Sequence, residues 1–146
     1  MPGFQPRDAN YRTRVTESFE QQPFARFVGS ELRRVEAGMV DIALPFMPEL
    51  AQQDGYVHGG VITSIADAAA GFAALTLVAA GAGVLTAELK VNFLRPAGTG
   101  LLLAEGRVVK PGRTLTIVQT DVTEQNSDGV KHVLTGIVTV MAVDSQ

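Results

Sequence analysis

The segment HGGVITSIADAAAGFAALTLVAA, residues 58–80, decides how the rest of the chain can fold. Its composition predicts one long apolar helix from about Gly59 to Ala80, closed by Gly81 and Gly83. The residues in the middle of this helix are mostly alanine and glycine, which are small enough for a sheet to pack closely against the helix backbone. Asp67 is the single carboxylate in the segment and is therefore a candidate functional group. The widest apolar stripe is expected to comprise Val61, Ile65, Ala68, Phe72, Leu75 and Ala79.

This apolar run is long enough in principle to cross a bilayer, but its charges argue against that interpretation. Asp67 lies inside the run, and no Lys or Arg lies close to either end as an anchor. We therefore expect a buried central helix and no membrane association.

Length and composition narrow the possible classes of protein. The 146 residues fit one compact domain, and the net charge of −3 argues against nucleic-acid binding. The absence of cysteine excludes disulfides and thiolate metal sites, and two histidines alone make a metal site improbable. The polar start carries no apolar segment typical of a signal peptide, so we expect a cytoplasmic protein. Residues 1–26 are predicted to form a leader with a short helix over Arg12–Gln22, stopped by Pro23, and residues 27–146 the domain.

The segments on either side of the long helix have the pattern of strands. Before it, Leu32–Glu36 and Met39–Phe46 flank Ala37-Gly38, a predicted hairpin turn. After it, apolar residues alternate with polar ones and are expected to face a core: Leu85, Ala87, Leu89, Val91 and Phe93. Further strands are predicted over Leu101–Lys110, Leu115–Glu124 and His132–Val143, joined by a type II turn at Pro111-Gly112 and a turn at Asp128-Gly129.

Tight turns between these strands make neighbouring strands antiparallel. A curved antiparallel sheet needs its apolar face covered, and the long helix is the only predicted element suited to cover it. The sequence therefore predicts an α+β fold, in which a curved antiparallel sheet wraps around one long central helix, with a short N-terminal helix added.

The order of these elements, together with three motifs, resembles the hotdog-fold acyl-CoA thioesterases, and specifically the phenylacetate-degradation (PaaI-like) branch. The motifs are Gly55-x-x-His58-Gly59-Gly60 with Asp67 nine residues beyond His58, Asn92-Phe93-Leu94-Arg95-Pro96, and Gly112-Arg113-Thr114. The resemblance covers roughly Phe27 to Val143. It implies hydrolysis of acyl-CoA thioesters to free acid and CoA by a homo-oligomer, with no cofactor because coenzyme A is part of the substrate.

The start of the long helix offers a way to polarise a thioester carbonyl. Backbone N–H groups in the first turn of a helix are unsatisfied and carry partial positive charge. Gly59 and Gly60 are thus predicted to direct donors at the developing oxyanion, and losing one such donor typically costs about 2.7–4 kcal/mol of transition-state stabilisation. The resemblance implies the same assignment.

Asp67 lies too far along the helix to serve the same carbonyl within one chain. It comes eight positions after Gly59, which corresponds to about 12 Å of axial rise. A two-fold dimer would bring Asp67 of one chain to the helix start of its partner and create two equivalent sites. We therefore expect at least a dimer, and the resemblance favours a tetramer built from two dimers.

The role of Asp67 stays open at this stage. It can attack the thioester directly or deprotonate a water molecule, and the structural alternative is a buried Asp that binds Thr63, Ser64 or a loop. His58 is expected to orient the loop or the thioester more than to transfer a proton.

The resemblance adds Gln52 as a ligand of the carbonyl or of water, and Thr86 as a hydroxyl near the nucleophilic water. It also places Arg95, Arg113 and Thr114 near CoA, where basic side chains suit phosphates. Ordinary exposed side chains explain each of these residues equally simply. The acyl pocket is expected to be lined by Phe46, Met47, Leu50, Tyr56 and Phe72, which accept aryl and alkyl groups alike.

Two other functions fit the same residues. One is a different hotdog enzyme that acts on acyl thioesters, such as a hydratase or dehydratase, and the other is a non-catalytic acyl-CoA-binding module. The sequence also leaves open whether CoA or an acyl-carrier protein holds the acyl group.

Overall fold

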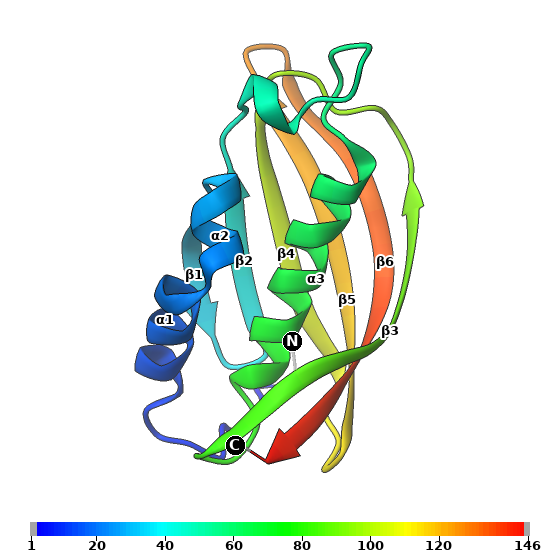
Figure 1. Cartoon of the computed structure of the whole chain (residues 1–146). Coiled ribbons are helices and arrows are strands. Elements are labelled where there is room, and N and C mark those ends of the chain that lie inside the picture. The colour runs from blue at the N-terminus through cyan, green and yellow to red at the C-terminus, as the bar shows by residue number, and fades with distance from the viewer. Residues whose placement is uncertain (1–2, 145–146) are drawn as a thin grey trace.

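The computed structural model describes residues 3–144, which form a sheet curved around one long helix (Figure 1). The helices are α1 (Tyr11–Gln21), α2 (Pro23–Val28), the 3-10 turn η1 (Pro48–Leu50) and α3 (Gly59–Leu75). The strands are β1 (Glu31–Glu36), β2 (Met39–Leu44), β3 (Ala82–Phe93), β4 (Leu101–Lys110), β5 (Leu115–Asn126) and β6 (Gly129–Asp144).

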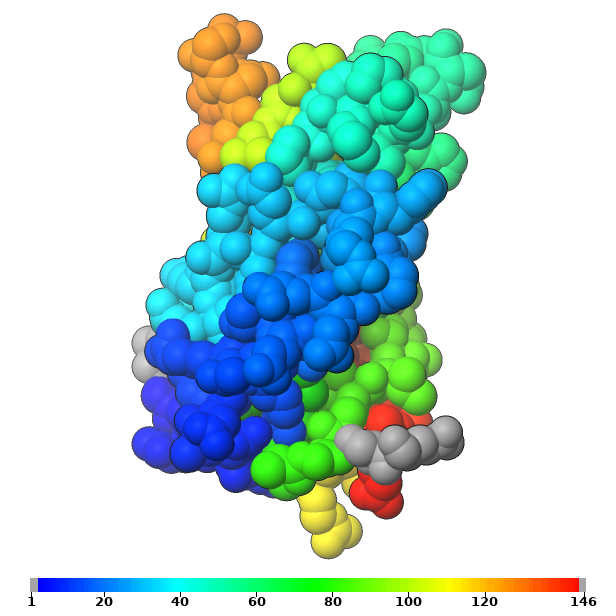
Figure 2. Space-filling model, turned by 60° about the vertical axis from the view of Figure 1, so that its left-hand side comes forward, coloured from blue at the N-terminus to red at the C-terminus, as the bar shows by residue number. Residues whose placement is uncertain are grey.

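The six strands form one antiparallel sheet in the order β1-β2-β4-β5-β6-β3. The helix α3 lies in the hollow of the sheet, and α1 and α2 lie beside it (Figure 1). From the side of α1 and α2, these two helices hide most of α3 (Figure 2). The predicted α+β architecture is therefore confirmed.

The central helix packs on the sheet through its smallest residues. Ala66, Ala69, Ala70 and Ala73 are fully buried, whereas Val61 and Ala68 of the predicted stripe are only partly buried. A Cβ added to Gly106 of β4 would lie 2.3 Å from the carbonyl oxygen of Ala69. The predicted stripe of larger residues was thus partly wrong, because close backbone approach selects the alanine face.

The helix ends five residues earlier than the sequence predicted. Thr76 is buried, and its hydroxyl donates to the carbonyl of Ala73 at 2.6 Å and accepts the N–H of Gly38 at 2.7 Å. Gly81 adopts the left-handed conformation (φ 82°), but Gly83 lies within β3. Contacts with the β1–β2 turn, remote in sequence, therefore decide where α3 stops. No helix within residues 3–144 has the length and apolarity that a membrane span requires.

The strand β3 does not keep the simple alternation that was predicted. A bulge between Thr86 and Glu88 shifts the register with β6. Because Thr86 pairs with buried Val140 and Leu89 with buried Val138, residues 84 and 86 face α3 before the bulge, and residues 89, 91 and 93 face it afterwards. Leu85 is consequently on the outer face and 60% exposed.

Of two breaks predicted at prolines, one is confirmed. The first helix, α1, ends at Gln21 before Pro23, and Pro23 then begins α2, since proline suits the first position of a helix. Gly112 lacks the positive φ that the third residue of a type II turn requires, so Pro111-Gly112 does not form that turn.

Replacing glycine by alanine is expected to have opposite effects on stability at two positions. Gly106→Ala is expected to lower the free energy of unfolding by about 1–3 kcal/mol, because its Cβ would collide with the backbone of α3. Gly71→Ala is expected to raise it by about 1 kcal/mol, because a Cβ there meets nothing within 4 Å and alanine favours helix. Urea unfolding of both variants checks this, and equal effects would contradict the proposed packing.

Candidate active site

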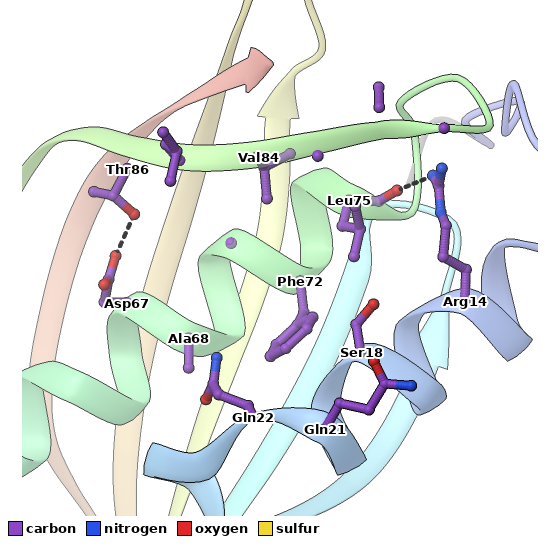
Figure 3. Close-up of a pocket in the computed structure, with 15 residues that line it drawn as sticks. Arg14, Ser18, Gln21, Gln22, Asp67, Ala68, Phe72, Leu75, Val84 and Thr86 are labelled. Carbon is purple, nitrogen blue, oxygen red and sulfur yellow. Dashed lines mark hydrogen bonds between the residues drawn. The ribbon is translucent and has the colours of Figure 1, made fainter. Parts of the chain in front are cut away.

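The Asp67 carboxylate lies between α3 and β3. The Thr86 hydroxyl donates to Asp67 Oδ1 at 2.6 Å (Figure 3). The preceding carbonyl, that of Ala66, accepts the buried hydroxyl of Thr120 at 3.0 Å, which fixes this turn of α3 on β5. The structure thus brings the predicted site residues Asp67 and Thr86 together, whereas Thr63 and Ser64 donate to the helix backbone instead.

The start of α3 leaves one backbone donor free. His58 is the N-cap residue, and its Nδ1 accepts the N–H of Gly60 at 2.8 Å. The N–H of Gly59 makes no hydrogen bond to any described residue. The ring of Phe93 lies against Gly59, 3.3 Å from where a Cβ would stand. Of the two predicted oxyanion donors, Gly59 is therefore the available one, and His58 holds the other.

The loop before α3 is fixed by its own backbone. His58 N–H donates to Leu50 at 2.9 Å, and Val57 N–H donates to Ala97 at 3.0 Å. The side-chain oxygen of Gln52 accepts the N–H of Asp54. Gln52 therefore closes the turn before α3, and its contact with a carbonyl or a water molecule stays a prediction.

One continuous helix carries both candidate catalytic groups. Gly59 and Asp67 lie in α3, which runs from Gly59 to Leu75. The rise of an α-helix separates them by about 12 Å along its axis. A single thioester carbonyl cannot contact both groups of one chain.

A groove of about 710 Å³ extends from Asp67 and Thr86 between α1, α3 and β3 (Figure 3). Its volume is within the range of small-molecule sites. Of the acyl-pocket residues predicted from the sequence, only Phe72 lines it. The others lie on the loops before α3 and do not line this groove, so their place in an acyl pocket stays a prediction. The polar side chains that line it from the end of α1, Ser18 and Gln21, and from Gln22 just after α1 were missed because a polar helix face resembles any solvated surface.

The three residues predicted to bind CoA do not meet within one chain. Arg95 follows β3, and its Nη1 donates to the carbonyl of His132 at 3.2 Å. Arg113 and Thr114 lie in the β4–β5 turn, at the opposite end of the ten-residue strand β4. Their proposed contacts with CoA therefore remain predictions.

A buried carboxylate that the sequence analysis missed anchors the loop beside the helix start. Glu124 is 1% exposed; it accepts N–H groups from Gly98 at 3.1 Å and Gly100 at 2.9 Å and pairs with Lys131 at 2.8 Å. Burial alone would raise the pKa of Glu124, but the Lys131 ammonium and the two N–H donors outweigh burial and lower it. The inward positions of β5 alternate up to Glu124, and this periodicity was the available signal.

A second polar pair lies outside the candidate site. His132 Nε2 contacts Asp121 Oδ1 at 2.8 Å, on the face of the sheet away from α3. Within residues 3–144, no three His, Asp or Glu side chains are grouped to hold a metal ion.

Comparison with known proteins identifies the family. A model described as "Thioesterase superfamily" matches residues 54–131, more than half of the chain. The chain belongs to the thioesterase superfamily. A solved thioesterase family protein from Silicibacter pomeroyi is 35% identical, with a TM-score of 0.90 over 92% of this chain and 99% of that one.

Two further proteins are similar at lower identity. The PaaI protein from the phenylacetic acid degradation operon of E. coli is 17% identical and shares the fold, with a TM-score of 0.84 over 94% of this chain and 96% of that one. The 1,4-dihydroxy-2-naphthoyl-CoA hydrolase of Listeria monocytogenes is 26% identical over 67% of this chain and 80% of its own length. These likenesses agree with the hotdog fold predicted from the sequence.

The Glu124 anchor predicts a specific pH dependence. Because the folded-state pKa is lowered, the carboxylate stabilises the fold above its unfolded pKa of about 4.3 and loses this contribution as pH falls through the folded value. Glu124→Gln is expected to lower the free energy of unfolding by about 1–3 kcal/mol at pH 7, because its uncharged NH₂ cannot replace Oε2, which pairs with Lys131 and accepts from Gly98.

Urea titrations from pH 7 to pH 3 measure this difference. The loss of unfolding free energy caused by Glu124→Gln should become smaller below about pH 4. The control Glu17→Gln, at an exposed position, should change the free energy of unfolding little at any pH. A constant difference between wild type and Glu124→Gln at all pH values would refute the assignment.

Proposed function

We propose that the protein hydrolyses acyl-CoA thioesters to the free acid and CoA, in a site that two subunits complete. The observation that carries this proposal is the arrangement of α3: a free Gly59 N–H at its start, and the Asp67–Thr86 pair beside a groove about 12 Å away. Membership of the thioesterase superfamily supports thioester hydrolysis, and the Listeria relative is named for a CoA ester.

The outer strand β3 supports a dimer. It pairs with β6 on one side only and is mostly exposed, with Leu85 60% and Phe93 53% exposed. A long edge strand with apolar side chains is a template for pairing with another chain. Antiparallel pairing of β3 with its two-fold copy satisfies this edge.

Such pairing also brings the two halves of the site together. Phe93, at the end of β3, lies against Gly59, and Thr86, in its first half, contacts Asp67. Because antiparallel pairing sets the end of one strand beside the start of the other, the helix start of the partner approaches Asp67. Further association into a tetramer is part of the same proposal.

The chemistry then divides between the subunits. The Gly59 N–H, at the positive end of the helix dipole, stabilises the oxyanion that forms on the thioester carbonyl. Asp67 of the other subunit attacks the carbonyl carbon, or takes a proton from a water molecule that attacks it; the C–S bond then breaks and CoA leaves. In the first route the acyl group forms an anhydride with Asp67, and water then hydrolyses this anhydride to the free acid and restores the carboxylate. Thr86 orients the carboxylate, His58 holds the helix start, and Arg95, Arg113 and Thr114 are the proposed contacts of CoA.

Removing the carboxylate tests the first half of this site. Asp67→Asn is expected to lower kcat at least about 100-fold, because an amide is neither nucleophile nor base. The free energy of unfolding should change by less than about 1 kcal/mol, because the amide oxygen still accepts from Thr86. Thiol release from a panel of acyl-CoA esters is the measurement, with Asp128→Asn in the β5–β6 turn as the control.

The outcomes separate the alternatives. Retained turnover in Asp67→Asn removes this residue from the mechanism. Saturable binding of acyl-CoA without thiol release in the wild type would favour a binding module, and conversion of the acyl chain without thiol release would favour a hydratase or dehydratase.

Removing the backbone donor tests the second half. Gly59→Pro deletes the N–H at the first position of α3, where proline is tolerated, and the extended conformation of His58 (ψ 134°) suits a residue before proline. Kcat should fall about 100- to 1,000-fold. Gly59→Ala is the matched control, since it adds the same Cβ against Phe93 but keeps the N–H. An equal fall in kcat in both variants would show that the added Cβ against Phe93, and not the missing N–H, causes the loss of activity.

A further inference from the structure

The groove beside Asp67 carries a polar wall that the proposed hydrolysis does not use. We infer that this wall selects acyl groups that are apolar along their length and carry a neutral hydrogen-bonding substituent, such as a hydroxyl, which Ser18 and Gln21 of α1 and the adjacent Gln22 bind. This inference rests on the proposed function, because the groove is the acyl site only if Asp67 acts on a thioester.

The helix α1 runs antiparallel to α3 along the groove. Arg14, early in α1, donates to Leu75 near the end of α3, and Gln22, just after α1, lies near Ala68 (Figure 3). The T-shaped contact of Phe19 with Phe72, with ring centres 5.7 Å apart, holds the two helices together. The groove therefore follows α3 from Asp67 towards Leu75, about 12 Å along the axis.

The floor and the β3 wall of the groove are apolar. Ala68, Gly71 and Phe72 come from α3, and Val84 comes from β3 (Figure 3). Gly71 leaves open space where a side chain would stand. A flexible or aromatic carbon skeleton that starts at the carbonyl beside Asp67 gains apolar contacts along this floor.

The α1 wall is polar, and its polar groups are free. Ser18 and Gln22 are partly buried and Gln21 is exposed, and the side chains of all three make no hydrogen bond to any described residue. A carboxamide both donates and accepts, as does a hydroxyl, so these groups match a hydroxyl or carbonyl on the substrate. An acyl chain without polar atoms binds less well beside Ser18, Gln21 and Gln22, because it leaves their polar groups without a hydrogen-bond partner.

The groove holds no free positive charge for an anionic substituent. Arg14 is the one cationic residue among the described residues that line it. Its Nη1 donates to Ala79, its Nη2 donates to Leu75 and Val78, and its Nε faces Asp8. Because these donors are engaged and Asp67 itself is an acid, a carboxylate on the acyl group finds no ion pair. The wall is therefore expected to favour acyl groups with a neutral hydrogen-bonding substituent and to disfavour acyl groups with a negative charge.

Three matched thioesters test the inference: hexanoyl-CoA, 6-hydroxyhexanoyl-CoA and hexanedioyl-CoA, together with the corresponding eight-carbon set. They differ only at the end of the acyl chain. We expect kcat/KM to be about tenfold higher for a hydroxyacyl ester than for the plain ester of at least one length, and lowest for the dioate. Gln21→Met and Gln22→Met, alone and combined, keep the length of the side chain and remove its polar group.

The combined variant should lose this hydroxyl preference through a lower kcat/KM for the hydroxyacyl ester, with the plain ester unchanged or faster. The Glu17→Gln control, on α1 but outside the groove, should keep it, and thermal unfolding verifies that each variant is folded. Equal kcat/KM for plain and hydroxyacyl esters in the wild type, or a preference that survives the loss of both glutamines, overturns the inference alone. No thiol release from any ester overturns the proposed function as well.

Discussion

The contact between the backbone of α3 and the sheet is the constraint on which the other features depend. Alanines on the helix and Gly106 on β4 let the two backbones approach until a single Cβ would not fit. This contact, together with the hydroxyl of Thr120, fixes the rotation of the helix about its axis. Asp67 consequently faces Thr86 on β3 and opens onto the groove.

The same helix makes a single chain insufficient for the proposed chemistry. The Gly59 N–H and the Asp67 carboxylate lie about 12 Å apart along the axis of α3, so the two groups of one chain cannot contact the same thioester carbonyl. In the proposed dimer the exposed edge of β3 joins the two halves of the site, because its first half carries Thr86 and its end carries Phe93, which lies against Gly59. The position of α3 on the sheet therefore explains both why one chain holds only half of each proposed site and why the β3 edge is the place for a second chain.

Local patterns predicted most of the fold but not the contacts that complete it. The bounds of β4 and the start of α3 follow from alternation and from His58-Gly59-Gly60, which are local signals. The early end of α3 depends on Thr76 meeting the β1–β2 turn, and the β3 bulge depends on its register with β6. Asp67 and Thr86 were predicted as site residues, whereas the α1 wall required knowing which helix packs beside them, because long-range packing leaves little trace in local sequence.

Mixing two inactive variants tests the central claim most directly. Asp67→Asn and Gly59→Pro subunits, co-expressed with different tags and purified as heterodimers, contain one site with both defects and one with neither, if each site combines both chains. The account predicts that these heterodimers recover about half of the wild-type activity, far above either parent. Heterodimers as inactive as their parents would show that each chain builds its own site, and would contradict the account.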